Sequence, residues 1–174
     1  MIEPSKIGTY AAKYEKENCK FRVFLKRHAN CAELDKQFLE LHNELFAKYD
    51  CCKCNNCCKL CVIPLKIKEV KLIAELLEIN ESDFISQYLE CNADEETEGK
   101  NYVIKERPCC FLDPDGKCKV QKCKPSACRD YPFTNKRDRL SNMFSVIESA
   151  GHCPIVFEML ERLKKIYGFK SRKN

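Results

Sequence analysis

The sequence predicts an α+β fold that is mostly α and has a minor β element. Several segments carry apolar residues at the three- and four-residue spacing that places them on one face of a helix. The clearest of these segments contains Leu34, Phe38, Leu41 and Leu45. The stretches rich in β-branched and aromatic residues are short and confined to 102–104 and 143–147. Strands should therefore form only a small part of the structure.

Helices are expected over most of 1–50 and again after the break at Pro64. The second helical stripe runs through Ile67, Val70, Ile73 or Ala74, and Leu77. We expect Ser82 to cap a short third helix, since a serine side chain accepts hydrogen bonds from the first turn. The acidic stretch 94–99 should be a solvent-exposed loop, and 155–167 a last amphipathic helix.

The composition is that of a globular protein of 174 residues, with 44% hydrophobic and 33% charged residues. No apolar stretch approaches the roughly 18 residues of a membrane span. The N-terminus also lacks the apolar segment of a signal peptide. We therefore expect a cytoplasmic protein that does not enter a membrane.

Cysteine is the residue type that indicates the chemistry of this protein, metal binding. The chain has 15 cysteines, and residues 51–61 read CCKCNNCCKLC. Without a secretion signal, such density favours metal binding over disulfides, and an odd count would leave one thiol over. One exception stays open, because the Lys/Glu-rich, tryptophan-free composition would suit a thermophile, whose intracellular proteins can contain disulfides. We expect an N-terminal helical segment, 1–50, and a small metal-stapled domain, 51–174.

The first cysteine cluster has the spacing of metal ligands, with two residues between successive thiols. On a single helix, all its cysteines except Cys52 would fall within a stripe about 120° wide. Those cysteines are Cys51, Cys54, Cys57, Cys58 and Cys61. The run also fits the Cys-x2-Cys-x2-Cys-x3-Cys spacing of bacterial [4Fe–4S] ferredoxins. It departs from them because no proline follows Cys61 and no second such run exists.

The net charge of +5 does not indicate nucleic-acid binding. Two zinc ions on eight thiolates would leave about +1, and one [4Fe–4S] cluster on four thiolates about +3. Lysines lie among the cysteines, where they would offset that negative charge. We expect no nucleic-acid partner and leave a protein partner open.

The second cysteine cluster spans 109–133. Its turn signal Asp113–Gly116 should carry Cys109 and Cys118 back toward each other. Further along, Cys128 precedes Arg129, and Cys153 directly precedes Pro154. Arg129 is open to two interpretations, a hydrogen-bond donor to a cluster sulfur or a member of an ordinary loop salt bridge.

The combined motifs resemble the CxxCxxCC cysteine-cluster family, described as a zinc- or iron-chelating domain. They are CxxCxxCC at 51–58, CxFL-x5-C at 109–118, CRxYPF at 128–133 and CP at 153–154. The resemblance covers roughly 50–155 and implies eight metal ligands: Cys51, Cys54, Cys57, Cys58, Cys109, Cys118, Cys128 and Cys153. The chain departs from the family at Asn55, where glycine is common, and at Gln121 and Lys124, where tyrosine and arginine are usual.

Three functional hypotheses follow. The first is a protein with an iron–sulfur cluster, [4Fe–4S], that serves electron transfer or supports a partner's reaction. The second is a zinc-chelating or metal-handling protein. The third is an enzyme that modifies protein lysines and has a structural metal centre, because flagellin lysine methylases are similar in these motifs. The sequence identifies no catalytic residue, since its three histidines offer little for acid–base chemistry.

Overall fold

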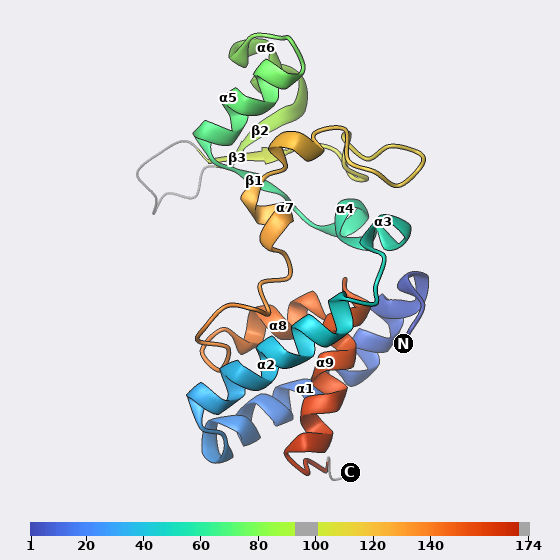
Figure 1. Ribbon diagram of the computed structural model, residues 1–174, viewed down its shortest axis with the longest axis vertical. Coiled ribbons are helices and arrows are strands. Elements are labelled where there is room, and N and C mark those ends of the chain that lie inside the picture. The colour runs from blue at the N-terminus through green and yellow to red at the C-terminus, as the bar shows by residue number, and fades with distance from the viewer. Residues whose placement is uncertain (93–100, 171–174) are drawn as a thin grey trace. The chain divides into compact units, whose positions relative to one another are not determined.

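The computed structural model describes residues 1–92 and 101–170, and it divides the chain into two compact units (Figure 1). Unit 1 combines Met1–Cys51 with Pro132–Asn174, and unit 2 is Cys52–Tyr131. Each unit has a hydrophobic core of its own. The division expected from the sequence, 1–50 and 51–174, stays a prediction about domains. The acidic stretch 94–99 lies outside the described residues.

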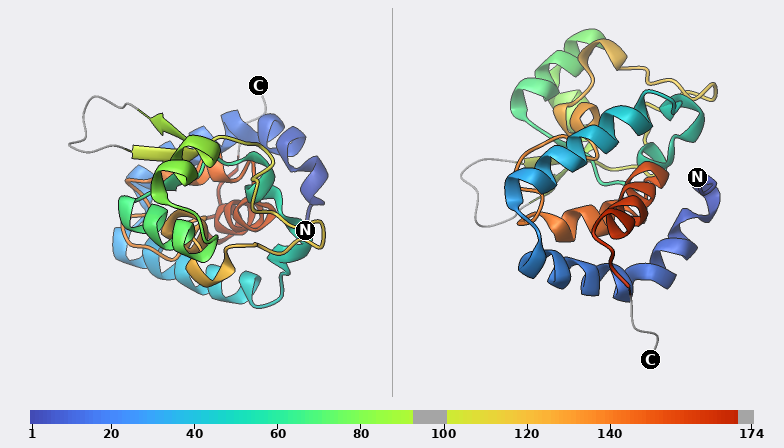
Figure 2. Two further views of the ribbon diagram at one scale, coloured as in Figure 1. Left: turned by 90° about the horizontal axis from the view of Figure 1, so that it is seen from above. Right: turned by 60° about the horizontal axis from the view of Figure 1, so that its bottom comes forward.

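Unit 1 is helical. A 3-10 turn, η1 (Pro4–Lys6), precedes the helices α1 (Ile7–His28), α2 (Cys31–Phe46), α8 (Met143–Ser149) and α9 (Pro154–Ile166). Helix α9 packs against the other three helices, which lie around it in Figure 2. All four apolar residues of the stripe predicted in α2 are buried, which confirms that helix and its core-facing side. Helix α9, predicted over 155–167, is confirmed as well.

Unit 2 contains a small antiparallel sheet in the order β1-β3-β2. Its strands are β1 (Pro64–Leu65), β2 (Leu89–Asn92) and β3 (Asn101–Ile104), and the backbone of Val103 pairs with Pro64 on one side and Glu90 on the other. The helical elements are α3 (Cys51–Cys54), which begins at the boundary residue, α4 (Asn56–Leu60), α5 (Ile67–Leu76), α6 (Glu81–Tyr88), η2 (Gln121–Cys123) and α7 (Ser126–Asp130). The core of the unit includes Val70, Ile73 and Phe84 from α5 and α6.

The predicted fold class is confirmed, because the structure is mostly helical with one minor sheet. The strand predicted at 102–104 is present as β3. None of the described helices combines the length and the apolarity that crossing a membrane requires.

The strand predicted at 143–147 is wrong, since this segment forms helix α8. Met143, Val146 and Ala150 are buried at helical spacing, whereas Phe144 is 60% exposed. A strand would have placed residues 144 and 146 on the same face. Packing on the core of unit 1 therefore outweighed the preference of β-branched and aromatic residues for strands.

The predicted cap of the third helix is also wrong. Helix α6 begins at Glu81, so Asn80 is its N-cap, and the Asn80 Oδ1 accepts a 2.9 Å hydrogen bond from the Asp83 amide. Asparagine caps helices as well as serine does. The Ser82 hydroxyl instead donates to the same Asn80 oxygen. In α5, Val70, Ile73 and Ala74 of the predicted stripe are buried as expected, whereas Ile67 is 50% exposed.

Candidate metal centre

The first cysteine segment forms two short helices instead of the single helix that would align its thiols. Helix α3 ends at Cys54 and α4 begins at Asn56, because Asn55 has a φ of 53° and lies in the left-handed region. Asparagine is among the few non-glycine residues that adopt this conformation readily. Its side-chain amide donates to the Cys52 carbonyl oxygen and supports the bend. The prediction of one 120° stripe of thiols is therefore wrong.

The second cysteine segment contains the predicted turn. The Gly116 amide donates a 2.9 Å hydrogen bond to the Asp113 carbonyl oxygen, and Leu112 forms a β-bridge with Cys118. Gly116 has a φ of +86°, and a Cβ built on it would overlap the Cys52 carbonyl oxygen. Only glycine fits such a position without a shift of the backbone. The turn therefore lies directly against the first cysteine segment.

The two cysteine segments also meet at their thiols. The Cys109 amide donates a 2.8 Å hydrogen bond to the Cys58 carbonyl oxygen. Negative charge on the Cys58 sulfur is one of several influences on the pKa of Cys109, Cys118 and Cys128, and in each case it acts to raise the pKa. Such coupling requires the charges to be near one another. We call these residues the four-thiol group: Cys58, Cys109, Cys118 and Cys128.

Two members of the four-thiol group have a lowered pKa, which favours their thiolate forms. A hydrogen bond from Cys57 is the main cause that lowers the pKa of Cys58 to about 6, and the charges of Lys124 and Lys59 contribute. A hydrogen bond from Cys110 lowers the pKa of Cys109 to about 7, against opposing effects of burial and of Cys58. Thiolate is the form of cysteine that ligates metals.

The other two members are held as thiols in the absence of a cation. Burial raises the pKa of Cys128 to about 12, and repulsion from Cys58 adds to it. Burial likewise raises the pKa of Cys118 above its ordinary value. A bound cation would favour the charged forms of both, because it attracts the negative sulfurs and deprotonates them outright.

The four thiols are neighbours, but they do not surround one point. Within residues 1–92 and 101–170, no three His, Cys, Asp or Glu side chains are arranged to share a single metal ion. Around one tetrahedral zinc ion, with Zn–S bonds of roughly 2.3 Å, the sulfurs would lie only about 3.8 Å apart. The chemistry of the donor set, four soft thiols, fits zinc or an iron–sulfur cluster. Binding a single ion would require the side chains to move closer together.

The eight predicted ligands are distributed over both units. Unit 2 contains Cys54 and Cys57 in addition to the four-thiol group. Cys51 and Cys153 belong to unit 1, where Cys153 directly precedes α9 and packs against the core of that unit. No disulfide joins any of the 15 cysteines, all of which lie in the described ranges. The eight-ligand set stays a prediction from the sequence.

Sequence reasoning did not identify Glu69, which positions the helix that carries Cys128. One carboxylate oxygen of Glu69 accepts a 2.7 Å hydrogen bond from the Ser126 amide at the start of α7. Its other oxygen accepts a 2.8 Å bond from the Lys66 amide at the start of α5. Glu69 thereby holds the two helix starts together. Its place in the first turn of α5 was visible in the sequence, but its contact 57 residues away was not.

Arg129 forms a loop ion pair, one of its two predicted roles, and donation to a cluster sulfur stays a prediction. Its Nε lies 3.7 Å from the Asp130 carboxylate, and its Nη1 donates to the Lys124 carbonyl oxygen at 3.5 Å. The side chain is 66% exposed, so this ion pair adds little stability.

The family comparison bears on this arrangement of thiols. Residues 50–154, more than half of the chain, match the family CxxCxxCC, which is described as "Putative zinc- or iron-chelating domain". The chain belongs to the CxxCxxCC family. All eight predicted ligands lie within the matched region. Searches of curated proteins and of solved structures gave no match. Membership in the CxxCxxCC family supports metal binding as the general activity of this domain.

Proposed function

We propose that this protein binds a [4Fe–4S] cluster through its clustered cysteines and uses it for electron transfer or to support a partner's reaction. The observation that carries this proposal is the four-thiol group. Its members come from α4, from the two ends of the 109–118 turn and from α7. Four cysteine thiolates are the ligand set of a [4Fe–4S] cluster.

The spacing of the thiols favours a cluster over one ion. The thiols interact electrostatically, yet no three of them converge as a single ion demands. A four-iron cluster binds each cysteine to a different iron, so its sulfur ligands lie farther apart than those of one zinc ion. A cluster is therefore easier to reconcile with thiols that do not converge on one ion.

The surroundings of the thiols suit a redox centre. Cys109, Cys118 and Cys128 pack at the edge of the apolar core of unit 2, and such a shell limits the access of water. The charges of Lys59 and Lys124 act on Cys58. When bound, the cluster would supply one-electron chemistry at a potential set by this balance of burial and charge.

Zinc chelation is the second candidate, because the family description names zinc and iron alike. The test is purification without oxygen, followed by a visible spectrum and by iron, sulfide and zinc analysis. We expect a brown protein with about four irons and about four sulfides per chain. A colourless protein with stoichiometric zinc under the same conditions would refute the cluster and establish the zinc alternative.

A further inference from the structure

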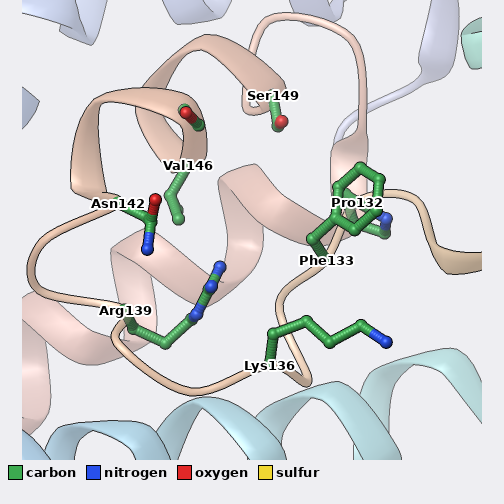
Figure 3. A pocket seen from close by; sticks show the side chains of 8 residues that line it. Pro132, Phe133, Lys136, Arg139, Asn142, Val146 and Ser149 are labelled. Atoms are coloured by element: carbon green, nitrogen blue, oxygen red, sulfur yellow. The ribbon is translucent and has the colours of Figure 1, made fainter. Parts of the chain in front are cut away.

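Unit 1 contains a pocket of about 270 Å³ that none of the predicted metal ligands lines (Figure 3). Its polar lining comes from Lys136, Arg139, Asn142, Ser145 and Ser149, and Val146 forms an apolar wall. Two of the lining side chains are cationic, and none is a carboxylate. The lining therefore selects for negative charge.

Arg139 is the buried cation of this pocket, with only 6% of its surface exposed. Its Nε and Nη2 donate to a single carbonyl oxygen, that of Arg137, at 3.2 and 2.8 Å. The Nη1 group has no hydrogen-bond partner in the described part of the chain, and in Figure 3 the guanidinium extends between Asn142 and Phe133. Nη1 is not among the buried side-chain atoms that lack a hydrogen-bond partner, so it reaches the open part of the pocket, where an anion could accept a hydrogen bond from it.

Two acidic side chains outside the lining, Asp35 and Asp138, act on the charge of Arg139. The Asp35 carboxylate is engaged by the backbone amides of Asp138 and Arg139, at 2.9 and 2.8 Å. Burial lowers the pKa of Arg139, and the charges of Asp35 and Asp138 oppose that shift. Arginine nevertheless stays cationic at neutral pH, because its ordinary pKa is above 12. The guanidinium thus presents a positive charge to the pocket.

The polar wall opposite Arg139 comes from α8 and its N-cap. Asn142, Ser145 and Ser149 are spaced by three and four residues, so they share one face of the helix. The two hydroxyls can each donate a hydrogen bond, and the Asn142 amide, which already donates one hydrogen to the Asp138 carbonyl oxygen at 2.9 Å, has a second to donate. Val146 lies on the same face, is buried, and provides an apolar contact beside the donors.

We propose that this pocket binds the phosphate group of a small phosphorylated molecule. A phosphate monoester has three acceptor oxygens and nearly two negative charges at neutral pH. It therefore suits a pocket with several hydrogen-bond donors and two cationic side chains better than a carboxylate, which has two oxygens and one charge. The volume lies just below the roughly 300–1,000 Å³ of ordinary ligand pockets, so the molecule is small. Val146 and the Phe133 ring would contact its organic part.

The test is calorimetric titration of the metal-loaded protein with inorganic phosphate and phenyl phosphate, and with acetate and benzoate for comparison. We expect saturable binding of both phosphates and much weaker binding of both carboxylates. Because phosphate could also bind a metal, matched variants locate the site. Lys136→Gln should weaken phosphate binding about fivefold through loss of a charged donor. Arg137→Gln removes the same charge from an exposed side chain outside the lining and should leave binding unchanged.

A second pair repeats the comparison without a change of charge. Ser149→Ala should weaken phosphate binding, whereas Ser141→Ala, whose hydroxyl is exposed and does not line the pocket, should not. Helical circular dichroism of all variants should match the parent protein. The proposal is overturned if phosphate shows no saturable binding, if carboxylates bind as tightly, or if each variant behaves like its control.

Discussion

Two backbone positions determine how the first cysteine segment lies against the second. Asn55 bends the chain between α3 and α4 with a φ of 53°, and Gly116 lets the 113–116 turn approach the Cys52 carbonyl oxygen. Both residues act on the backbone that carries the thiols and supply no ligand themselves. Each offers a substitution that leaves all cysteines in place.

At Asn55, replacement by valine should cost about 1–2 kcal/mol of unfolding free energy, because a β-branched residue is strained in the left-handed region. Replacement by glycine should change stability by far less, since it relieves strain while losing the bond to the Cys52 carbonyl oxygen. Chemical denaturation of the metal-loaded proteins measures both. Equal losses for Asn55→Val and Asn55→Gly would show that the side-chain hydrogen bond matters and the conformation does not.

At Gly116, replacement by alanine should destabilise unit 2 by about 2 kcal/mol or more, because it adds strain at positive φ to an overlap with backbone. The metal content should fall as well, since the turn would move away from Cys52. Gly8→Ala is the control, because a Cβ there meets nothing within 4 Å. Metal analysis and denaturation of the two variants make the comparison, and unchanged metal content in Gly116→Ala would contradict the account.

Much of the candidate site could be predicted from individual residues and their spacing. Cysteine spacing singled out the thiols, and the Asp113–Gly116 signal predicted the turn that the structure contains. The bend at Asn55 could not be predicted from helical geometry alone, because it depends on one residue tolerating an uncommon conformation. Pairing between adjacent thiols, as in Cys57 and Cys58, also depends on that local backbone.

Among the elements, α5 holds α7 in place through one side chain. Glu69 accepts hydrogen bonds from Ser126 and Lys66, and α7 carries Cys128. The insert between the two cysteine segments thus positions a predicted ligand in addition to forming the core of unit 2.

Glu69→Ala should therefore weaken the metal site although Glu69 is not a ligand. Loss of the acceptor leaves the Ser126 amide unpaired at a helix start, which costs about 1–2 kcal/mol. We expect faster loss of metal to a chelator, followed through the visible spectrum. Glu75→Ala, on an exposed position of the same helix, is the control. The positioning role is rejected if both variants release metal at the parent rate.

Helix α8 shows why elements are harder to predict than residues. Its Met143–Ile147 run has the β-branched and aromatic residues of a strand, but it also fits a helical stripe that buries Met143 and Val146. Short segments with both patterns are decided by the neighbours that they pack against. The mistaken strand also concealed the shared face of Asn142, Ser145 and Ser149.

For the whole molecule, the separate cores of the two units predict separate responses to metal removal. The cysteine segments 51–61 and 109–128 contribute few residues to a core, so metal–sulfur bonds should order them. Unit 1 buries large apolar side chains from four helices, including Phe21, Phe38 and Leu160. Its stability should depend far less on metal.

Hydrogen exchange read by mass spectrometry tests this expectation. After chelation, amides of β3 and of the 109–128 segment should exchange at least about tenfold faster, while amides in α2 and α9 stay protected. The metal-loaded protein under the same conditions is the reference. Equal loss of protection in both units would mean that the metal stabilises the entire chain, and no change anywhere would mean that it orders neither unit.

The fold class was predictable because long amphipathic helices carry a strong periodic signal. The course of the chain after residue 131 was not, because residues 132–170 join helices about a hundred positions earlier. That return depends on contacts such as Asp35 with the Arg139 amide, which leave no local pattern in the sequence.

The central claim, that the four-thiol group holds the metal centre, is tested most directly by iron and zinc content in single-cysteine variants purified without oxygen. Cys58→Ser, Cys109→Ser, Cys118→Ser and Cys128→Ser should each lose most of the metal, because a serine hydroxyl is a poor ligand for soft metals. Cys52→Ser and Cys123→Ser, which change neighbours of the group, should retain the parent content. Full metal content in the four-thiol variants, or equal loss in all six, would contradict the account.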